Sequence, residues 1–468
     1  MHRHLKCFGF FALNLLGLIN LSAQASAIET VFTLQAPNGQ WVVRALTHAT
    51  HCPTIQWDNQ APLPMSLRAA QATLLARPAV AAADKKPVVF DVTTCESTWP
   101  AHAKAATVEG TVVPAPPREI RRMLIVADTG CRMKAADQAF QDCNDPRQWP
   151  FAEVAQSAAK LQADLVVHIG DIHYRESPCP LGRASCANAT WGYGWDAWRD
   201  DFFKPAAPLL ASAPWLFVRG NHESCARAGQ GWFRFLDALP LTTQRSCNDP
   251  ADDVHGDFSE PFAAAIDTNT QFIVFDSSKT AWRPYAPTDP AFVKYQAQLK
   301  TVEQLVKQKP ESFFINHHPL LAATPVKDPA TFSAGGNEGL LSVFAAHSPE
   351  RLFPPGVTLA LHGHIHMFES LSFKSNHPAS LVLGNSGSQN EMVPPKTIGP
   401  ADRVYKNAVV NHYAASAEYG FATLDRVGDT QSGSWLLTEY NTQGQAVILC
   451  RIQAGKSVCN KTVAATAQ

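Results

Sequence analysis

The sequence predicts an α/β protein in which a layered, mixed β-sheet core is flanked by helices, with a smaller β-rich domain at the N-terminus. Three observations support this fold class. From residue 121 onward, short apolar runs typical of buried strands alternate with segments of helical periodicity. Before residue 112, β-rich runs are instead separated by turn residues. With 468 residues, the chain is also too long for one average domain.

The first 25 residues have the layout of a cleaved secretory signal. Arg3 and Lys6 precede an apolar run, and small residues follow it around Ala25. The alternative is a membrane anchor, but the run is short for a bilayer span and polar residues interrupt it. We therefore expect residues 1–25 to be removed and the mature protein to have no stable membrane anchor. The expected location is periplasmic or extracellular.

The cysteine count fits an exported protein. The chain has 11 Cys, of which Cys7 leaves with the signal, and the remainder is an even number. In an oxidising compartment this indicates disulfides, and the order along the chain suggests local pairs, although the sequence leaves other connectivities open. A thiolate metal site is the alternative, but no C-x-x-C pair occurs. The expected pairs are Cys52 with Cys95, Cys131 with Cys143, Cys179 with Cys186, Cys225 with Cys247, and Cys450 with Cys459.

Residues 26–117 are expected to form the small β-rich N-terminal domain. Asn38 and Gly39 lie between two β-rich runs, which is a strong hairpin signal. An Ala-rich stretch at 66–84 is compatible with either a helix or a surface loop. The Pro-rich segment 112–120 indicates a linker to the next domain.

The catalytic domain is placed at 118–459, followed by a loose tail at 460–468. It begins with a β-α-β unit, because an amphipathic helical segment lies between two buried-type strands. Such a unit holds its strands parallel, with their carboxyl ends at one edge of the sheet. A second helix should start at Asp289, an N-cap residue that precedes Pro290. The expected strands are 121–128, 164–171, 271–278, 312–318, 357–366 and 380–387, and the expected helices are 150–163 and 289–308.

Polar side chains stand where several of these strands end. They are Asp128, Asp171, Asn221, His317, His364 and His366. In isolation each has an ordinary explanation, such as a capping Asn or a packed His, but their joint occurrence at strand ends favours one shared site. Carboxylate, amide and imidazole ligands suit Fe, Zn or Mn better than Ca or Cu(I). The set is large enough to hold two ions with a bridging carboxylate.

The ordered motifs resemble those of the calcineurin-like metallophosphoesterase superfamily, and their variant forms resemble its purple acid phosphatase branch. Many members of the superfamily open with D-x-H, whereas this chain has Asp128-Thr129-Gly130. The second motif, which begins at Gly170, has the G-D-x-x-Y form and supplies Tyr174. The loss of a His ligand and the gain of a Tyr are coupled changes. The resemblance runs from about residue 121 to the strand after "HGHIH" and does not include the first hundred residues.

The resemblance implies two metal ions, Fe(III) with a divalent Fe, Zn or Mn. Asp171 would bridge the two ions, and Tyr174 bound as tyrosinate would colour the protein. The alternative for Tyr174 is ordinary packing. The first ion would be held by Asp128, Asp171, Tyr174 and His366. The second would be held by Asp171, Asn221, His317 and His364.

The function implied by the resemblance is hydrolysis of phosphate monoesters by in-line attack of a metal-bound hydroxide. His222 is expected to protonate the leaving oxygen, or else to brace a ligand. Glu223 would orient His222 or merely end the motif. The alternative function is a phosphodiesterase or nucleotidase of the same superfamily. A binding protein on a retired phosphoesterase fold is disfavoured because no ligand is missing from the set.

The partner is expected to be a small phosphate ester. With 39 Lys and Arg against 40 Asp and Glu, the formal charge is −1, which argues against nucleic acid as a structural partner. Weaker candidates for substrate contacts are His173, His318, His362 and the turn 384–388. The Trp-rich run 190–198 is expected to be core rather than a pocket wall.

Overall fold

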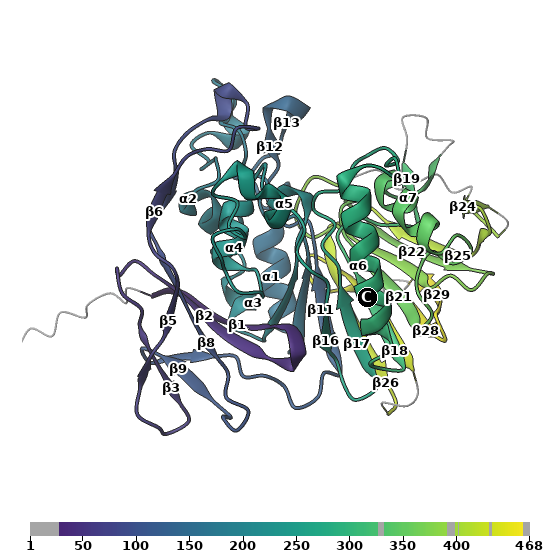
Figure 1. The fold of residues 1–468 in the computed structure, drawn as a ribbon, viewed down its shortest axis with the longest axis horizontal. Coiled ribbons are helices and arrows are strands. Elements are labelled where there is room, and N and C mark those ends of the chain that lie inside the picture. The colour runs from purple at the N-terminus through teal and green to yellow at the C-terminus, as the bar shows by residue number, and fades with distance from the viewer. Residues whose placement is uncertain (1–27, 326–331, 391–397, 401, 430–432, 462–468) are drawn as a thin grey trace, which may run out of the picture.

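The computed structural model describes residues 28–325, 332–390, 398–400, 402–429 and 433–461. The expected signal at 1–25 and residues 462–468 of the expected tail lie outside this part. Two β-sheets pack face to face, and helices cover their outer faces, so the molecule has four layers (Figure 1). This is the layered α/β architecture predicted from the sequence.

The larger sheet has eleven strands, and its centre is parallel. Strands β11, β14 and β15 run parallel to one another, which confirms the expected β-α-β unit. The N-terminal strand β1 pairs in parallel with β15, and the C-terminal strand β26 pairs antiparallel with β11. In spatial order the strands are β29 (Lys456–Lys461), β28 (Ala446–Gln453), β27 (Ser434–Asn441), β26 (Gly420–Val427), β11 (Arg122–Val126), β14 (Leu165–Ile169), β15 (Trp215–Val218), β1 (Ile28–Gln35), β2 (Trp41–Thr47), β8 (Thr93–Thr98) and β5 (Ser66–Ala69).

The second sheet has eight strands and also contains a parallel centre, formed by β17, β18, β21 and β23. In spatial order its strands are β16 (Phe262–Ala265), β17 (Thr270–Val274), β18 (Glu311–Ile315), β21 (Val357–His362), β23 (Ala379–Leu383), β22 (Phe368–Phe373), β25 (Ala408–Ser416) and β24 (Arg403–Tyr405). The smaller sheets contain β3 (Thr54–Trp57), β4 (Leu63–Pro64), β9 (Ala106–Val108) and β10 (Thr111–Val113), and the pairs β6 (Ala72–Leu74) with β7 (Val88–Phe90), β12 (Met133–Lys134) with β13 (Ala139–Phe140), and β19 (Ala322–Pro325) with β20 (Phe332–Gly335).

Both predicted helices are present. Helix α1 (Phe151–Ala159) crosses between β11 and β14, and α6 (Pro290–Val306) starts at Asp289, whose side chain accepts a hydrogen bond from the Ala291 N–H. The other helices are α2 (Trp195–Trp198), α3 (Ala207–Leu210), α4 (Gly229–Phe235), α5 (Asp253–Gly256) and α7 (Glu338–His347). A π-helix, η5, spans Arg199–Phe203, and 3-10 turns are η1 (Pro37–Gly39), η2 (Ala82–Asp84), η3 (Ala135–Asp137), η4 (Ala184–Cys186), η6 (Asn221–Glu223) and η7 (Pro250–Asp252).

Alternate residues of the central strands face two different cores. On β11, Met123 and Ile125 point into the apolar layer between the sheets, while Leu124 and Val126 pack under helix α1. Helices α6 and α7 cover the outer face of the second sheet in the same way. Strands that are buried on both faces consist of continuous apolar runs, which explains the short apolar runs that the sequence shows from residue 121 onward.

The N-terminal region is β-rich, as expected, but its strands are shared with the larger sheet. The hairpin of β1 and β2 turns at Asn38 and Gly39, both with positive φ. The Ala-rich stretch 66–84 forms β5, β6 and a short 3-10 turn, so neither a continuous helix nor a plain surface loop describes it. Strands β3 and β9 pack with β1, β2 and β8 of the larger sheet around a separate small core that includes Trp57.

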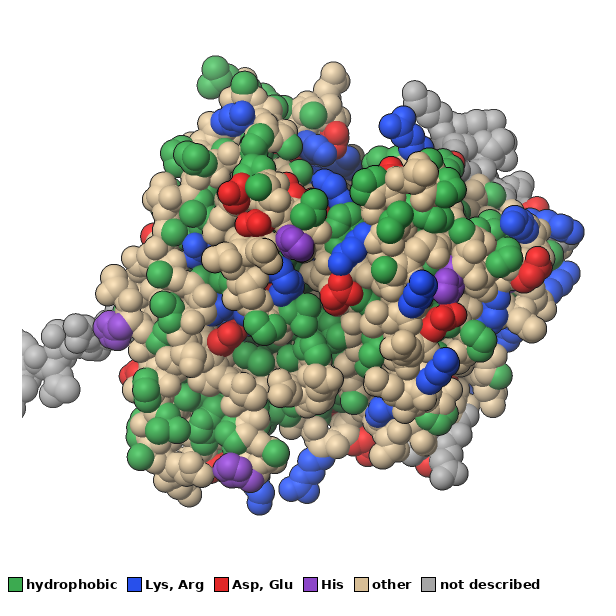
Figure 2. Space-filling model, viewed as in Figure 1, with side chains coloured by type: hydrophobic (Ala, Val, Ile, Leu, Met, Phe, Trp, Pro, Cys, Tyr) green, Lys and Arg blue, Asp and Glu red, His purple; other side chains and the backbone are tan. Residues whose placement is uncertain are grey.

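All five expected disulfides are present, so the local pairing is confirmed. On the face shown in Figure 2, acidic and basic side chains are interspersed over most of the surface, in keeping with a formal charge of −1. Within the described ranges, every helix is too short or too polar to cross a bilayer.

Candidate metal centre

The predicted site residues come together where the parallel strands of both sheets end. Asp128, Asp171 and Asn221 follow β11, β14 and β15 of the larger sheet. His317 follows β18, and His364 and His366 follow β21, in the second sheet. The face-to-face packing of the sheets therefore brings two groups of strand ends to one place.

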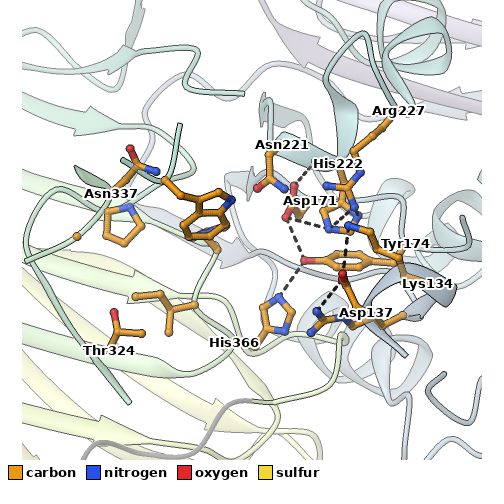
Figure 3. A pocket seen from close by; sticks show the side chains of 16 residues that line it. Lys134, Asp137, Asp171, Tyr174, Asn221, His222, Arg227, Thr324, Asn337 and His366 are labelled. Atoms are coloured by element: carbon orange, nitrogen blue, oxygen red, sulfur yellow. Dashed lines mark hydrogen bonds and ion pairs between the residues drawn. The ribbon is translucent and has the colours of Figure 1, made fainter. Parts of the chain in front are cut away.

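Tyr174 lies at the centre of the residues predicted for the first ion. Its hydroxyl is 3.1 Å from Asp171 Oδ2 and 2.9 Å from His366 Nε2 (Figure 3). It is also 2.9 Å from Asp128 Oδ1. All four side chains are almost fully buried. Burial, followed by the charges of Asp128 and Asp171, raises the pKa of Tyr174 well above its ordinary value, so only a bound cation would favour the ionised phenol here.

Asp171 also belongs to the residues predicted for the second ion. Its Oδ2 is 3.0 Å from His317 Nε2, and one ligand atom from each of Asp171, His317 and His364 lies within 4.8 Å of the others. Asp171 is thus the carboxylate that contacts residues of both predicted ligand sets. Although burial alone would raise its pKa, His317 and His222 hold the pKa well below its usual range.

The residues present fit a pair of hard or borderline cations. Asn221 lines a pocket together with Asp171 and Tyr174, and its Oδ1 is buried without a hydrogen-bond partner among the described residues. His317 and His366 each direct Nδ1 to a backbone carbonyl, of Ile169 and Gln389, at 2.7 Å. Such an outer hydrogen bond fixes the tautomer and leaves Nε2 to face the centre. The donor set therefore supports a metal site.

Backbone strain accompanies this arrangement. Asp128, Asp171 and His364 have φ values of 54°, 53° and 73°, in the left-handed region that side chains other than glycine rarely adopt. Gly220, next to Asn221, has no room for a side chain, because an added Cβ would lie 2.1 Å from Asp171 Oδ1. Three of the predicted ligand positions therefore have a strained backbone.

The structure explains why the D-x-G motif occurs with Tyr174. A Cβ at Gly130 would lie 2.9 Å from Tyr174 Cδ2, 2.6 Å from the Ile172 carbonyl and 2.7 Å from Asp201 Oδ2. These distances are shorter than van der Waals contact. A side chain at position 130 is therefore excluded by the Ile172 carbonyl and Asp201 as well as by the Tyr174 ring.

Two buried carboxylates brace the loop that carries Asp171 and Tyr174. Glu223 accepts hydrogen bonds from the backbone N–H groups of Asp171, Ile172 and His173 at 2.8 to 3.0 Å. Asp201 accepts from the N–H groups of Tyr174 at 2.6 Å and Cys131 at 2.7 Å. The expectation that Glu223 orients His222 is therefore wrong, because its carboxylate is taken up by the backbone.

Glu176 orients His222 instead. His222 Nδ1 lies 3.1 Å from Glu176 Oε1 and 3.0 Å from the His173 carbonyl. Arg227 pairs with the same carboxylate, Nε to Oε2 at 2.9 Å, and its Nη2 is 2.7 Å from His222 Nε2. Burial and then Arg227 lower the pKa of His222 to about 4.

The weaker sequence candidates are placed away from the open pocket. His173 and His362 are fully buried, and the His173 ring packs between aromatic side chains of the core. His318 is buried under His364, with the ring centroids 4.3 Å apart. The turn 384–388 donates the N–H groups of Ser386 and Ser388 to backbone carbonyls, so these groups are not offered to an anion.

The Trp-rich run packs as core, as predicted, with Trp195 and Trp198 buried. The exposed aromatic wall of the pocket is Trp282 instead, whose ring centroid lies 5.0 Å from that of His364. Sequence reasoning missed Trp282, Arg227 and Glu176. Only Glu176 carried a local signal, since it follows Tyr174 within the same loop.

The comparisons with known proteins agree with this geometry. The model of the family "Calcineurin-like phosphoesterase" matches residues 121–368, more than half of the chain. A purple acid phosphatase, PPD1, from yellow lupin (Lupinus luteus) seeds has a TM-score of 0.52 and 14% identity, over 93% of this chain and 74% of that chain. A structure of PhoD has a TM-score of 0.53 and 10% identity, over 95% and 94% of the two chains. At these identities the structures establish a shared fold only.

No curated protein matches the sequence. The family match spans the motifs from Asp128 to His366, and the fold and the grouped side chains agree with it. The chain therefore belongs to the calcineurin-like phosphoesterase family and is a phosphoric ester hydrolase.

Proposed function

We propose that the protein is an exported, dinuclear-metal acid phosphatase of the purple acid phosphatase type that hydrolyses phosphate monoesters. The observation that supports this branch is the Tyr174 hydroxyl, which lies within 3.1 Å of Asp128, Asp171 and His366. A phenol placed between carboxylates and an imidazole is suited to a trivalent iron. The absence of a side chain at Gly130 supports the same assignment.

The proposed ions are Fe(III) and a divalent Fe, Zn or Mn. When bound, such a pair activates a water and offsets the charge of the phosphoryl oxygens. The first would be held by Asp128, Asp171, Tyr174 and His366. The second would be held by Asp171, Asn221, His317 and His364.

His222 is the proposed proton donor to the leaving oxygen. Its backbone N–H is fixed on Asp171 Oδ1 at 2.8 Å, so the ring is held at the wall of the pocket beside the proposed metal ligands. A phosphate ester in the pocket would bring negative charge to the ring and favour its protonated form. Glu176 engages Nδ1, which leaves Nε2, with Arg227 Nη2 at 2.7 Å, as the ring nitrogen that would face the leaving oxygen.

Metal analysis with a visible spectrum tests the branch. The purified protein should contain iron and show a visible absorption band that disappears in Tyr174→Phe. A colourless, iron-free but active enzyme would remove the purple acid phosphatase assignment and leave the family assignment intact.

Substrate assays test the reaction. An aryl phosphate should be hydrolysed faster than the bis-aryl phosphate, and Asp171→Asn and His222→Ala should both lose most activity. A clear preference for the diester, or for nucleotides over simple monoesters, would establish the phosphodiesterase or nucleotidase alternative. Full activity in either variant would contradict the proposed site.

The five disulfides support the proposed export, because such bonds persist in oxidising compartments. N-terminal sequencing of protein recovered from the periplasm or the medium should find a mature chain that begins after Ala25. Recovery of full-length protein only from the cytoplasm would contradict the proposal.

A further inference from the structure

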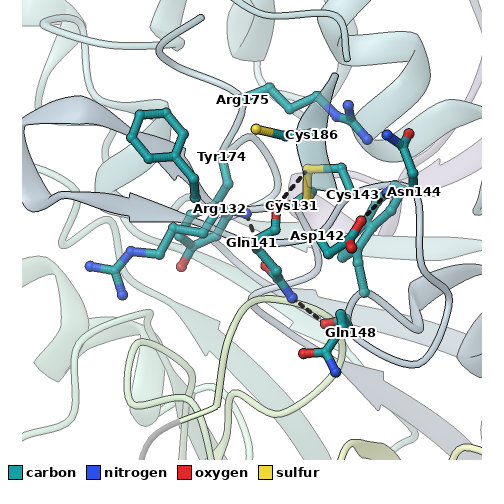
Figure 4. Close-up of a disulfide and its surroundings, with 12 residues drawn as sticks. Cys131, Arg132, Gln141, Asp142, Cys143, Asn144, Gln148, Tyr174, Arg175 and Cys186 are labelled. Atoms are coloured by element: carbon teal, nitrogen blue, oxygen red, sulfur yellow. Dashed lines mark hydrogen bonds between the residues drawn. A yellow bond between two sulfur atoms is a disulfide. The ribbon is translucent and has the colours of Figure 1, made fainter. Parts of the chain in front are cut away.

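A β-hairpin closed by a disulfide borders the proposed metal site. Strands β12 and β13 form a hairpin within residues 131–143, and the disulfide Cys131–Cys143 closes its base (Figure 4). The hairpin begins directly after the Asp128-Thr129-Gly130 motif. We call residues 131–143 the rim hairpin.

The rim hairpin is fixed to the site at its base. The Met133 N–H donates to the Tyr174 carbonyl at 3.0 Å, and the Met133 carbonyl accepts from the Ser177 N–H at 2.9 Å. The Gln141 side chain accepts from the Arg132 N–H and donates to the Gly387 carbonyl, at 3.0 and 2.8 Å. Met133 also packs with two disulfides in a small buried cluster. These contacts hold the hairpin in one position relative to Tyr174.

The rim hairpin carries a surplus of positive charge into the pocket. Arg132 and Lys134 line the pocket together with Asp137. Both cations contact that single carboxylate, at 3.1 and 3.4 Å, and both side chains remain 27% exposed. Arg227, the other lining cation, pairs with Glu176. Two positive charges of the rim hairpin therefore share one carboxylate at the pocket.

Neither Arg132 nor Lys134 is among the proposed metal ligands, and neither is the proposed proton donor. Exposed ion pairs of this kind contribute little to stability. The proposed metal ligands and His222 suffice for the reacting phosphoryl group, yet the cavity has a volume of about 380 Å³, enough for a ligand with several further groups. Figure 2 shows basic side chains bordering the notch beside β12 and β13.

We propose that Arg132 and Lys134 form a second anion subsite, so that the preferred substrates are phosphate monoesters carrying a second phosphoryl group. Arg132 offers a planar pair of N–H donors to that group, and Lys134 adds a mobile charge. The inference rests on the proposed monoesterase function and adds the class of substrate to it.

The test compares two substrates that differ only in the second phosphoryl group, adenosine 3′-monophosphate and adenosine 3′,5′-bisphosphate. Release of the 3′-phosphate is measured for the metal-loaded full chain. The wild type should prefer the bisphosphate in kcat/KM, and Arg132→Gln with Lys134→Gln should lower the ratio of the two kcat/KM values by about tenfold. High salt should lower the same ratio in the wild type.

Arg147→Gln is the matched control. Arg147 lies just beyond the same disulfide, is 85% exposed and does not line the pocket, so its removal takes away one positive charge outside the subsite, where the double variant takes away two inside it. It should leave the ratio unchanged. A wild-type ratio of kcat/KM values near one, or a ratio that the double variant retains, would overturn the proposed subsite. Monoester turnover in the same experiment would still support the proposed function. Absence of turnover of either substrate, and of an aryl phosphate, would overturn the function itself.

Discussion

Replacing Glu369 with Gln should stabilise the protein at about pH 8 and have little effect at about pH 5. Glu369 lies on β22 and is fully buried. Its carboxylate accepts hydrogen bonds from the backbone N–H of Ala323, at 3.1 and 3.3 Å. Burial raises the pKa of Glu369 from 4.5 to about 8, and the Ala323 hydrogen bond offsets only part of this rise.

The sign of the effect follows from proton binding. Because the folded state holds the proton of Glu369 more tightly, the unfolded chain releases it first as the pH rises, and stability falls between about pH 4.5 and 8. At about 1.4 kcal/mol per pH unit, the loss between pH 5 and 8 is roughly 4 kcal/mol. Gln has no proton to lose and can still accept from Ala323, so the variant avoids this loss.

Urea unfolding followed by Trp fluorescence, at several pH values from about 5 to 8, measures the difference between variant and wild type. That difference should grow with pH. Glu153→Gln, at an exposed position on α1, controls for the removal of one negative charge. A difference that stays constant across the pH range, or a variant that is less stable at pH 8, would refute the reasoning.

Three further results are expected. Gly130→Ala should lower the free energy of unfolding by about 1–3 kcal/mol and reduce the content of the proposed iron, because its Cβ would lie 2.6 Å from the Ile172 carbonyl, 2.7 Å from Asp201 Oδ2 and 2.9 Å from the Tyr174 ring. A normal iron content would show that this crowding does not disturb Tyr174. Glu176→Gln should lower kcat/KM at least about tenfold for an alkyl phosphate but little for p-nitrophenyl phosphate. An equal loss for both substrates would show that Glu176 has only a structural role. Chelation should abolish activity and lower the melting temperature reversibly, as read by scanning calorimetry before and after metal is restored.

Local sequence patterns predicted the parts of the fold that depend on neighbours in the chain. The β-α-β unit, the hairpin at Asn38 and Gly39, the start of α6 at Asp289 and all five disulfides are confirmed. Periodicity, turn chemistry and short cysteine loops encode such features directly. The strand ends that carry the predicted ligands also meet, because parallel strands share an edge.

Features that depend on contacts between distant segments were not predictable in this way. Nothing in its local pattern indicates that β1 pairs with β15. Trp282 lies in the loop after the expected strand 271–278, but its place beside His364 depends on how distant segments pack. Asp201 sits in a π-helix within an aromatic run, so its role as an acceptor for the Tyr174 N–H depends on tertiary packing alone.

The position of β26 in the larger sheet has a consequence for how the chain reaches its native state. Residues 122–126 are paired on one side by residues 420–427, close to the other end of the chain. A nascent chain that has emerged only as far as the ligands after β21 would therefore leave β11 as an open edge, prone to pairing with other chains. Sheets closed by such distant segments also fold slowly. The protein is thus expected to rely on protection from aggregation until its C-terminal strands have been made.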